Sequence, residues 1–252
     1  MRTISGTDAP PPRLNAALSP DRNGNLILYG GHEYMTPAFG DTWVLSESGW
    51  AQMTTATQPP QTLDPLMAFH EGIGKPVLIG RHLANGNTEV YEWSGTDWID
   101  KTPQVYQAGT GPQELYLSGA AYHQASRQLV LYGGYEKEAG SYGNGPMKHD
   151  FWGLGTLGGT GNGDGILSSW TRIRAVDQPS FRNPALSGSY SYPVMLAYDR
   201  SRGTLMAFAK EFAGTDNQYS LSLSGLVAEP SVLPADGVAV TRLTFQVADG
   251  SG

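Results

Sequence analysis

Short apolar runs that end in glycine recur along this chain, and two aromatic positions follow each run. The first run ends at Gly30 and Gly31, the second at Gly80 alone, and the third at Gly133 and Gly134. The aromatic positions that follow are Trp43 and Trp50, Tyr91 and Trp98, and Trp152 and Trp170. With one copy between the first and third runs, the period is about 50 residues, which is typical of a repeated unit of short strands.

Each copy divides into four predicted strands, a to d, joined by turns rich in Gly, Asn and Asp. In the first copy the strands are predicted at 15–18, 26–29, 42–45 and 50–53. Their counterparts in the next two copies are predicted at 67–69, 76–79, 89–93 and 98–99, and at 118–122, 129–132, 151–154 and 170–173. A fourth, weaker copy lacks the glycine pair and the last tryptophan, and its strands are predicted at 194–198, 204–208 and 218–223.

Residues 1–228 resemble the kelch repeats of galactose-oxidase-like proteins, and the glycine pairs and the aromatic positions carry the resemblance. It implies an all-β fold, a β-propeller of four-stranded antiparallel blades. It also implies that the glycines turn the chain and that the aromatics pack blade against blade. Four recognisable repeats are few for this family, so we expect either a small ring or an incomplete one. The radical copper site of galactose oxidases needs a cysteine, which this chain lacks, so no cofactor is expected.

The two ends of the chain fall outside the repeats. Residues 1–4 stand where a d strand would precede the first copy, so we expect them to complete the last blade, the alternative being a frayed terminus. Residues 232–237 lead into an alternating strand predicted at 238–247. This start resembles bacterial immunoglobulin-like domains of the invasin/intimin kind, which need roughly 100 residues. We therefore expect 229–252 to be a linker and the first strand of a truncated domain, with further domains in the same polypeptide.

Composition narrows the classes of partner. The 252 residues are 15% charged and include 33 Gly and 17 Pro, which suits short strands joined by tight turns. The net charge of −7 comes without a Lys/Arg cluster, so we expect no nucleic-acid partner. No apolar run approaches the roughly 18 residues of a membrane span, so no membrane insertion is expected. A signal peptide is not visible, so a protein at the cell surface or outside the cell would be a processed or truncated form.

Long predicted loops gather at one end of the expected blades, where recognition residues commonly lie. They are the b–c loops at 32–40, 81–88, 135–149 and 210–217 and the d–a loops at 54–64, 102–117 and 174–193. Polar or aromatic residues follow the b strands, and these are the candidate ligand-binding residues: His32, Glu33, Tyr34, Arg81, His82, Tyr135, Glu136 and Lys210. The alternative is that they are solvated loop residues.

Other polar features are expected to be structural. The five histidines lack metal-ligand spacing, so no metal site is predicted, and His70 and His123, which flank strand a, are expected to be hydrogen-bonded histidines of the barrel wall and not ligands. The glycine-rich segment 158–166 resembles a calcium-binding nonapeptide, but its Asp is one position late and the motif occurs once. A flexible hairpin insertion between strands c and d is the preferred interpretation. The acidic residues of the second copy, Glu89 and Glu92 among them, are expected to be solvated.

These observations predict a non-catalytic binding or adhesion module of a larger bacterial surface or secreted protein. Its ligand is expected to be a carbohydrate or a protein, held by the long-loop face. No catalytic residue is assigned. The alternatives are a carbohydrate-active hydrolase, lyase or epimerase with acid and base residues near the loops, and a purely structural spacer.

Overall fold

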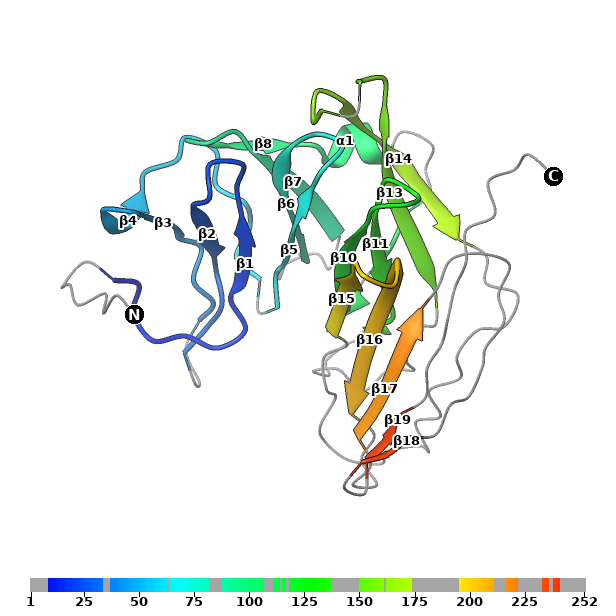
Figure 1. The fold of residues 1–252 in the computed structure, drawn as a ribbon. Coiled ribbons are helices and arrows are strands. Elements are labelled where there is room, and N and C mark those ends of the chain that lie inside the picture. Colours follow the sequence, from blue (N-terminus) through cyan, green and yellow to red (C-terminus); the bar gives the residue numbers. More distant parts are fainter. Residues whose placement is uncertain are drawn as a thin grey trace. The chain divides into compact units, whose positions relative to one another are not determined.

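The computed structural model describes residues 9–33, 37–62, 64–81, 88–106, 111–113, 115–116, 118–136, 150–160, 162–173, 195–210, 216–221, 233–235 and 238–240. Most of these residues lie in β-strands (Figure 1). The chain forms two compact units, unit 1 with residues 1–109 and 156–169, and unit 2 with residues 110–155 and 170–252. Among the described residues, no helix has the length and apolarity that a membrane span requires.

Unit 1 contains two four-stranded antiparallel sheets, each with its strands in chain order. The first sheet consists of β1 (Ala17–Pro20), β2 (Leu26–Tyr29), β3 (Thr42–Ser46) and β4 (Gly49–Met53). The second consists of β5 (Leu66–His70), β6 (Lys75–Arg81), β7 (Thr88–Trp93) and β8 (Trp98–Asp100), and the short helix α1 (Thr102–Val105) follows it. The predicted four-stranded meanders of the first two copies are therefore confirmed.

The third copy also forms a four-stranded antiparallel sheet. Its strands are β10 (Gly119–His123), β11 (Gln128–Tyr132), β13 (Phe151–Leu157) and β14 (Ile166–Ile173). Residues 156–169 of the β13–β14 hairpin group with unit 1, and the rest of the sheet with unit 2. Beside it, β9 (Leu115–Tyr116) pairs with β12 (Tyr135–Glu136).

The fourth sheet lies in unit 2 and begins with the antiparallel strands β15 (Met195–Asp199), β16 (Thr204–Lys210) and β17 (Asp216–Leu221). A short hairpin of β18 (Leu233–Ala235) and β19 (Val238–Val240) extends it, and β19 runs parallel to β17. The described part of the C-terminal segment is thus paired with the fourth copy. The rest of the strand predicted at 238–247, and the strand predicted at 1–4, lie outside the described residues.

The start of the first strand corrects the sequence prediction. Strand a of the first copy was expected at 15–18, but β1 begins at Ala17. Asn15 adopts a left-handed φ of 52°, which breaks the extended backbone. Its neighbour Leu14 pairs with His32 in an isolated bridge, so the chain joins the sheet only after this bend.

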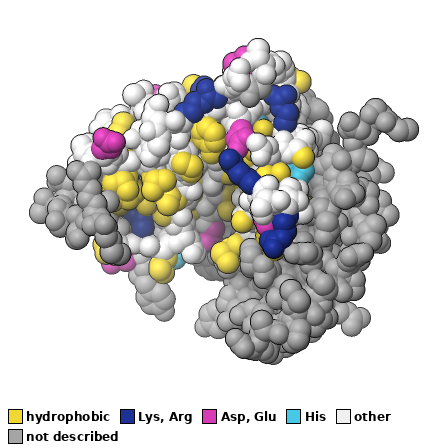
Figure 2. All heavy atoms as spheres, viewed as in Figure 1, with side chains coloured by type: hydrophobic (Ala, Val, Ile, Leu, Met, Phe, Trp, Pro, Cys, Tyr) yellow, Lys and Arg dark blue, Asp and Glu magenta, His cyan; other side chains and the backbone are white. Residues whose placement is uncertain are grey.

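The core of unit 1 lies between its two sheets. Side chains of the first sheet, Ala17, Ile27 and Tyr29, share a buried cluster with side chains of the second, including Trp98. The Trp98 ring packs edge-on against the Tyr29 ring, with centroids 5.8 Å apart, and Trp98 Nε1 donates a hydrogen bond to Thr42 Oγ1 at 2.8 Å. We call this side of the first sheet its front face, and the opposite side, with Leu18, its rear face. Figure 2 shows hydrophobic side chains gathered over this sheet.

Sheets of unit 2 also pack through their a strands, because β10 lies beside β15. The ring of His123 on β10 meets Tyr198 on β15 edge-on, with centroids 5.3 Å apart. His123 and His70 are both buried. The Nδ1 atom of His123 accepts a hydrogen bond from the backbone N–H of Ser126, so this histidine helps to close the β10–β11 turn.

Candidate recognition surface at the long-loop end

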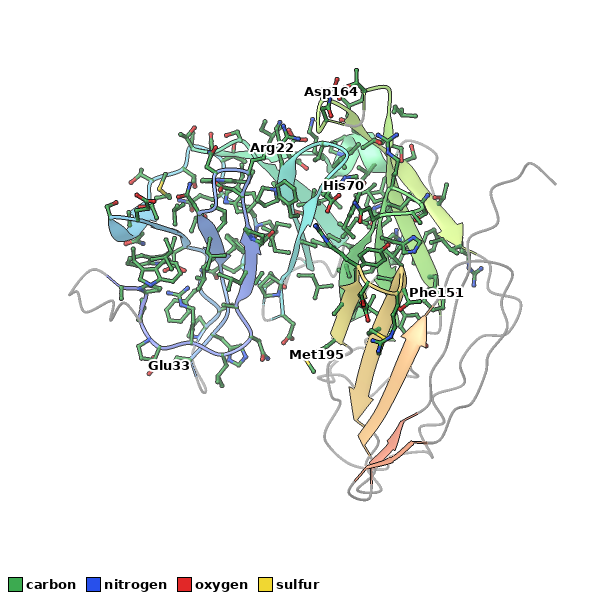
Figure 3. All side chains as sticks on the ribbon, in the orientation of Figure 1. Arg22, Glu33, His70, Phe151, Asp164 and Met195 are labelled. Carbon is green, nitrogen blue, oxygen red and sulfur yellow. The ribbon has the colours of Figure 1, made fainter. Side chains whose placement is uncertain are left out.

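The b–c and d–a loops of the first copy lie at the same end of the first sheet. A Cβ atom on Gly30 would stand 3.3 Å from Pro65 Cγ, and one on Gly40 would stand 3.1 Å from Gln61 Cγ. The other end carries the tight a–b turn, in which Asp21 Oδ1 accepts hydrogen bonds from the backbone of Asn23 and Asn25. Figure 3 shows Glu33 at one end of this sheet and Arg22 at the other. Long loops and tight turns are therefore separated, as the loop lengths predict.

The glycine pair of the first copy turns the chain out of the sheet. Gly30 and Gly31 have left-handed φ values of 66° and 85°. A Cβ atom on Gly31 would stand 2.6 Å from the carbonyl oxygen of Leu14, so a side chain does not fit there. Immediately afterwards, His32 N–H donates to Leu14 O at 3.0 Å and Leu14 N–H donates to His32 O at 2.7 Å.

The third copy repeats this construction. Gly133 and Gly134 have left-handed φ values of 69° and 95°, and Tyr135 then pairs with Tyr116. Tyr116 precedes β10 by the same interval as Leu14 precedes β1. The two copies with a glycine pair therefore place the residue after the glycines beside the segment that leads into strand a.

The second and fourth copies are built differently at this position. Arg81 continues β6 and pairs with Thr88, and Lys210 continues β16 and pairs with Asp216. Gly80 stands alone and has no left-handed φ. Without the pair of left-handed residues the b strand does not turn away, so these two positions stay in their own sheets.

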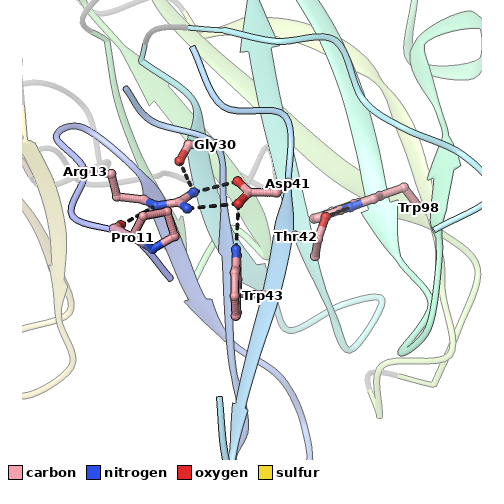
Figure 4. A network of polar contacts seen from close by, with 7 residues as sticks. All are labelled: Pro11, Arg13, Gly30, Asp41, Thr42, Trp43 and Trp98. Carbon is pink, nitrogen blue, oxygen red and sulfur yellow. Dashed lines mark hydrogen bonds and ion pairs between the residues drawn. The ribbon is translucent and has the colours of Figure 1, made fainter. Parts of the chain in front are cut away.

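A buried ion pair fixes the b–c loop of the first copy to the chain before β1 (Figure 4). Arg13 donates two hydrogen bonds to the Asp41 carboxylate, at 2.6 and 2.9 Å, and a third to Gly30 O at 2.9 Å. The Arg13 side chain is only 5% exposed, and its guanidinium lies 4.3 Å from the centre of the Phe39 ring. A two-pronged arginine–carboxylate contact of this kind holds both partners in one orientation.

Asp41 is held as a carboxylate. Burial alone would raise its pKa, but the hydrogen bonds from Arg13 and from Trp43 Nε1, together with the Arg13 charge, lower the pKa below its ordinary value. The Trp43 contact is 2.7 Å long. A carboxylate two residues before the c-strand aromatic recurs in the next copy, where Glu89 accepts a hydrogen bond from Tyr91 at 2.8 Å.

The same position in the third copy is Asp150, which pairs with Arg172. This recurrence of an acidic residue before the c-strand aromatic is a sequence signal that the repeat pattern contains, and it marks a side chain that orders the loop end. Arg13 has no such signal, because it stands before the first strand and has no counterpart in the repeat.

The described side chains among the predicted ligand-binding residues are His32 and Glu33. His32 is half-buried and its Nδ1 lies 3.3 Å from Glu33 O, while Glu33 is exposed. Tyr34 and His82 lie outside the described residues. The other four are described at the backbone only, and they are Arg81, Tyr135, Glu136 and Lys210. The structure thus brings His32 and Glu33 to the long-loop end of unit 1.

Glu92 corrects the expectation that the acidic residues of the second copy are solvated. Glu92 is 5% exposed, and its carboxylate forms ion pairs with Lys75 on β6 and, at 3.7 Å, with Lys101 after β8. Asp97 also has partners within the protein, because its carboxylate accepts hydrogen bonds from the backbone N–H groups of Thr57 at 3.0 Å and Trp98 at 2.9 Å. These carboxylates hold strands and turns together.

The glycine-rich hairpin after β13 is anchored, which corrects the expectation of a flexible insertion. Gly165 N–H donates to Gly72 O at 3.1 Å, and Arg22 donates to the carbonyl of Asn162. Asp164 accepts hydrogen bonds from Thr160 N–H at 2.8 Å and Thr160 Oγ1 at 3.1 Å, so its oxygens close their own loop. The described residues contain no group of three or more His, Asp or Glu that could hold a metal ion.

Comparisons with known proteins add no assignment. No protein-family model matches the sequence, and no curated protein matches it either. The contacts at the long-loop end are therefore the basis for a functional proposal.

Proposed function

We propose that this chain is a kelch-like β-propeller module whose blades are the three four-stranded sheets and the strands β15–β17, followed from residue 229 by the start of an immunoglobulin-like module. The period of about 50 residues supports it. So do the four-stranded meanders and the packing of neighbouring a strands, β1 on β5 and β10 on β15. The module belongs to a bacterial surface or secreted protein.

The function that the residues support best is non-catalytic binding of a carbohydrate or protein ligand at the long-loop end. One observation carries this proposal, the common construction of the first and third copies after their glycine pairs. It puts His32 and Tyr135 at equivalent backbone positions beside the segment that leads into strand a. A loop held by the Arg13–Asp41 pair loses little conformational freedom on binding, which favours recognition by a preformed surface.

The described acidic residues support binding rather than acid–base catalysis. A hydrolase of sugars needs two carboxyl groups facing a shared space. Here the Asp41 carboxylate accepts hydrogen bonds from Arg13 and Trp43, and Glu92 forms ion pairs with two lysines. Glu89 accepts from Tyr91. Each of these three groups has a structural partner.

A glycan and protein array tests the proposal. The probes are the unchanged chain, a His32→Ala/Glu33→Ala variant and an Arg81→Ala/His82→Ala variant, each checked for folding by circular dichroism. Asn23→Ala is the matched control, because Asn23 lies in the a–b turn at the other end of the first sheet. We expect specific binding that the loop-end variants lose and the control keeps. Binding that survives both loop-end variants, or the absence of any binding by the folded chain, would contradict the proposal.

A further inference from the structure

Leu14, at the long-loop end of unit 1, is an exposed apolar residue between two anchored neighbours. It is 52% exposed. The residue before it, Arg13, is bound to the Asp41 carboxylate through two hydrogen bonds. The residue after it, Asn15, adopts a left-handed φ of 52°, which asparagine tolerates better than most residues, and its Nδ2 donates to Asp64 Oδ1 at 2.7 Å. The fold therefore fixes the backbone of Leu14 and leaves its side chain at the surface of this unit.

Carboxylates stand on both sides of Leu14. Its backbone N–H and C=O both bond to His32, and the two segments run antiparallel. The next residue, Glu33, is exposed and follows on the side of the residue before Leu14. The Asp64 carboxylate is bonded to the residue after Leu14, which is the opposite side. The arginine before Leu14 is paired with Asp41, so its charge is balanced there and does not offset these two carboxylates.

These residue types set two requirements for a ligand. A half-exposed leucine is stabilised by an apolar group that removes it from water. The carboxylates beside it attract a cation, and the net charge of −7 favours the approach of a cationic partner. A polypeptide can meet both requirements with neighbouring side chains, whereas a neutral sugar offers no cation.

We propose that Leu14 is a contact residue of the long-loop end, and that its ligand is a polypeptide segment in which an apolar side chain lies beside a lysine or arginine. The apolar side chain covers Leu14, and the cation pairs with Glu33 or Asp64. Arg13 and Asn15 are positioning residues, because they tie the backbone of Leu14 to the two long loops, and a preformed backbone lowers the entropic cost of binding. The inference rests on the proposed function and narrows its ligand from a carbohydrate or protein to a protein.

Single thiols test whether position 14 is accessible in the full chain and whether a ligand covers it. The chain contains no cysteine, so Leu14→Cys and Leu18→Cys each carry one thiol. Leu18 is the matched control, because it is 50% exposed on β1 of the same sheet. We expect a maleimide to label both folded variants, and a peptide at about ten times its Kd to slow labelling of Leu14→Cys alone, by about 10-fold. A Leu14→Cys thiol that reacts in urea but not in the folded chain would overturn the proposal.

The peptides come from a displayed library of random linear sequences selected on the unchanged chain, and a glycan array is probed in parallel. We expect the selected peptides to carry an apolar residue beside Lys or Arg. Leu14→Ser and Glu33→Lys are each expected to raise Kd about 10-fold, and the effect of Glu33→Lys is expected to shrink at high salt. Leu18→Ser and Glu47→Lys are the matched controls, because Glu47 is exposed in the β3–β4 turn at the other end of the sheet. They are expected to change Kd less than about twofold, and circular dichroism checks that each variant is folded.

The outcomes separate this inference from the proposed function. A library that yields no binding peptide, or peptides that bind Leu14→Ser as tightly as the unchanged chain, would overturn the inference. A glycan whose binding needs His32 and Glu33 but not Leu14 would also overturn it, and would leave the proposed recognition at the long-loop end standing. Binding that survives both Leu14→Ser and His32→Ala/Glu33→Ala would contradict both proposals.

Discussion

Replacing Trp98 by alanine is expected to lower the free energy of unfolding by about 3–5 kcal/mol. Trp98 is 1% exposed and packs against Tyr29 and Trp93, with ring centroids 5.8 and 5.0 Å away. An aromatic side chain of this kind buries about 150–250 Å², which at about 25 cal/mol per Å² corresponds to about 4–6 kcal/mol. The expected cost of the substitution and the free energy from the buried area agree, so the loss is ascribed to the packing between the two sheets of unit 1.

The hydrogen bond from Trp98 to Thr42 is a separable part of this contact. Thr42→Val keeps the shape of the side chain and removes the acceptor, so the indole N–H is left buried without its partner. That change is expected to cost about 1–3 kcal/mol. Trp50→Ala is the matched control, since Trp50 occupies the same repeat position as Trp98 but is partly exposed, and its expected cost is about 1 kcal/mol.

Urea denaturation followed by circular dichroism, at one low protein concentration for all variants, measures these differences. The reasoning predicts the order Trp98→Ala, Thr42→Val, Trp50→Ala, from the largest loss to the smallest. Equal losses in Trp98→Ala and Trp50→Ala would refute the distinction between a buried and a partly exposed tryptophan at the same repeat position. An unchanged Thr42→Val variant would show that the indole N–H finds another partner.

Two further predictions concern the glycine turn and a buried histidine. Gly31→Ala is expected to lower the free energy of unfolding by about 2 kcal/mol more than Gly24→Ala in the same denaturation assay. Both glycines have a left-handed φ, but only at Gly31 would an added Cβ meet a backbone atom, Leu14 O at 2.6 Å. Equal losses would count against this close approach. Burial lowers the pKa of His123 below its ordinary 6.5. Between the lowered pKa and 6.5, His123 binds more protons in the unfolded chain than in the folded chain. The contribution of neutral His123 to the free energy of unfolding is therefore fully present above pH 6.5 and is lost as the pH falls toward the lowered pKa. His123→Phe is expected to flatten that part of the pH–stability curve, and an unchanged slope would assign it to another group.

Local pattern predicts the strands well where the residues that end a strand are themselves local. β2 begins and ends at the predicted residues because an Asn-Gly turn precedes it and a glycine pair follows it. β14 begins at Ile166, earlier than the predicted 170, since the glycine-rich hairpin is held by Gly72 from another sheet. Contacts of that kind join segments far apart in the chain, and no local pattern contains them.

The same limit applies to the candidate site. The glycine pairs marked the loop end because their left-handed backbone leaves a residue-type signal at each copy. Arg13 has no such signal in the sequence, since its partner Asp41 comes near only when the loop folds back on the chain before β1. Glu92 looked solvated because its lysine partners lie on either side of it in the folded sheet, at 75 and 101.

Hydrogen exchange of the chain with a ligand selected on the array tests the central proposal most directly. We expect slower exchange on binding in the b–c loop of the first copy, at 30–33 and 37–41, where His32 and Glu33 stand. The a–b turns at 21–25 and 71–74 lie at the other ends of these strands and are expected to stay unchanged. Protection confined to those turns, or to the rear face around Leu18, would contradict recognition at the long-loop end.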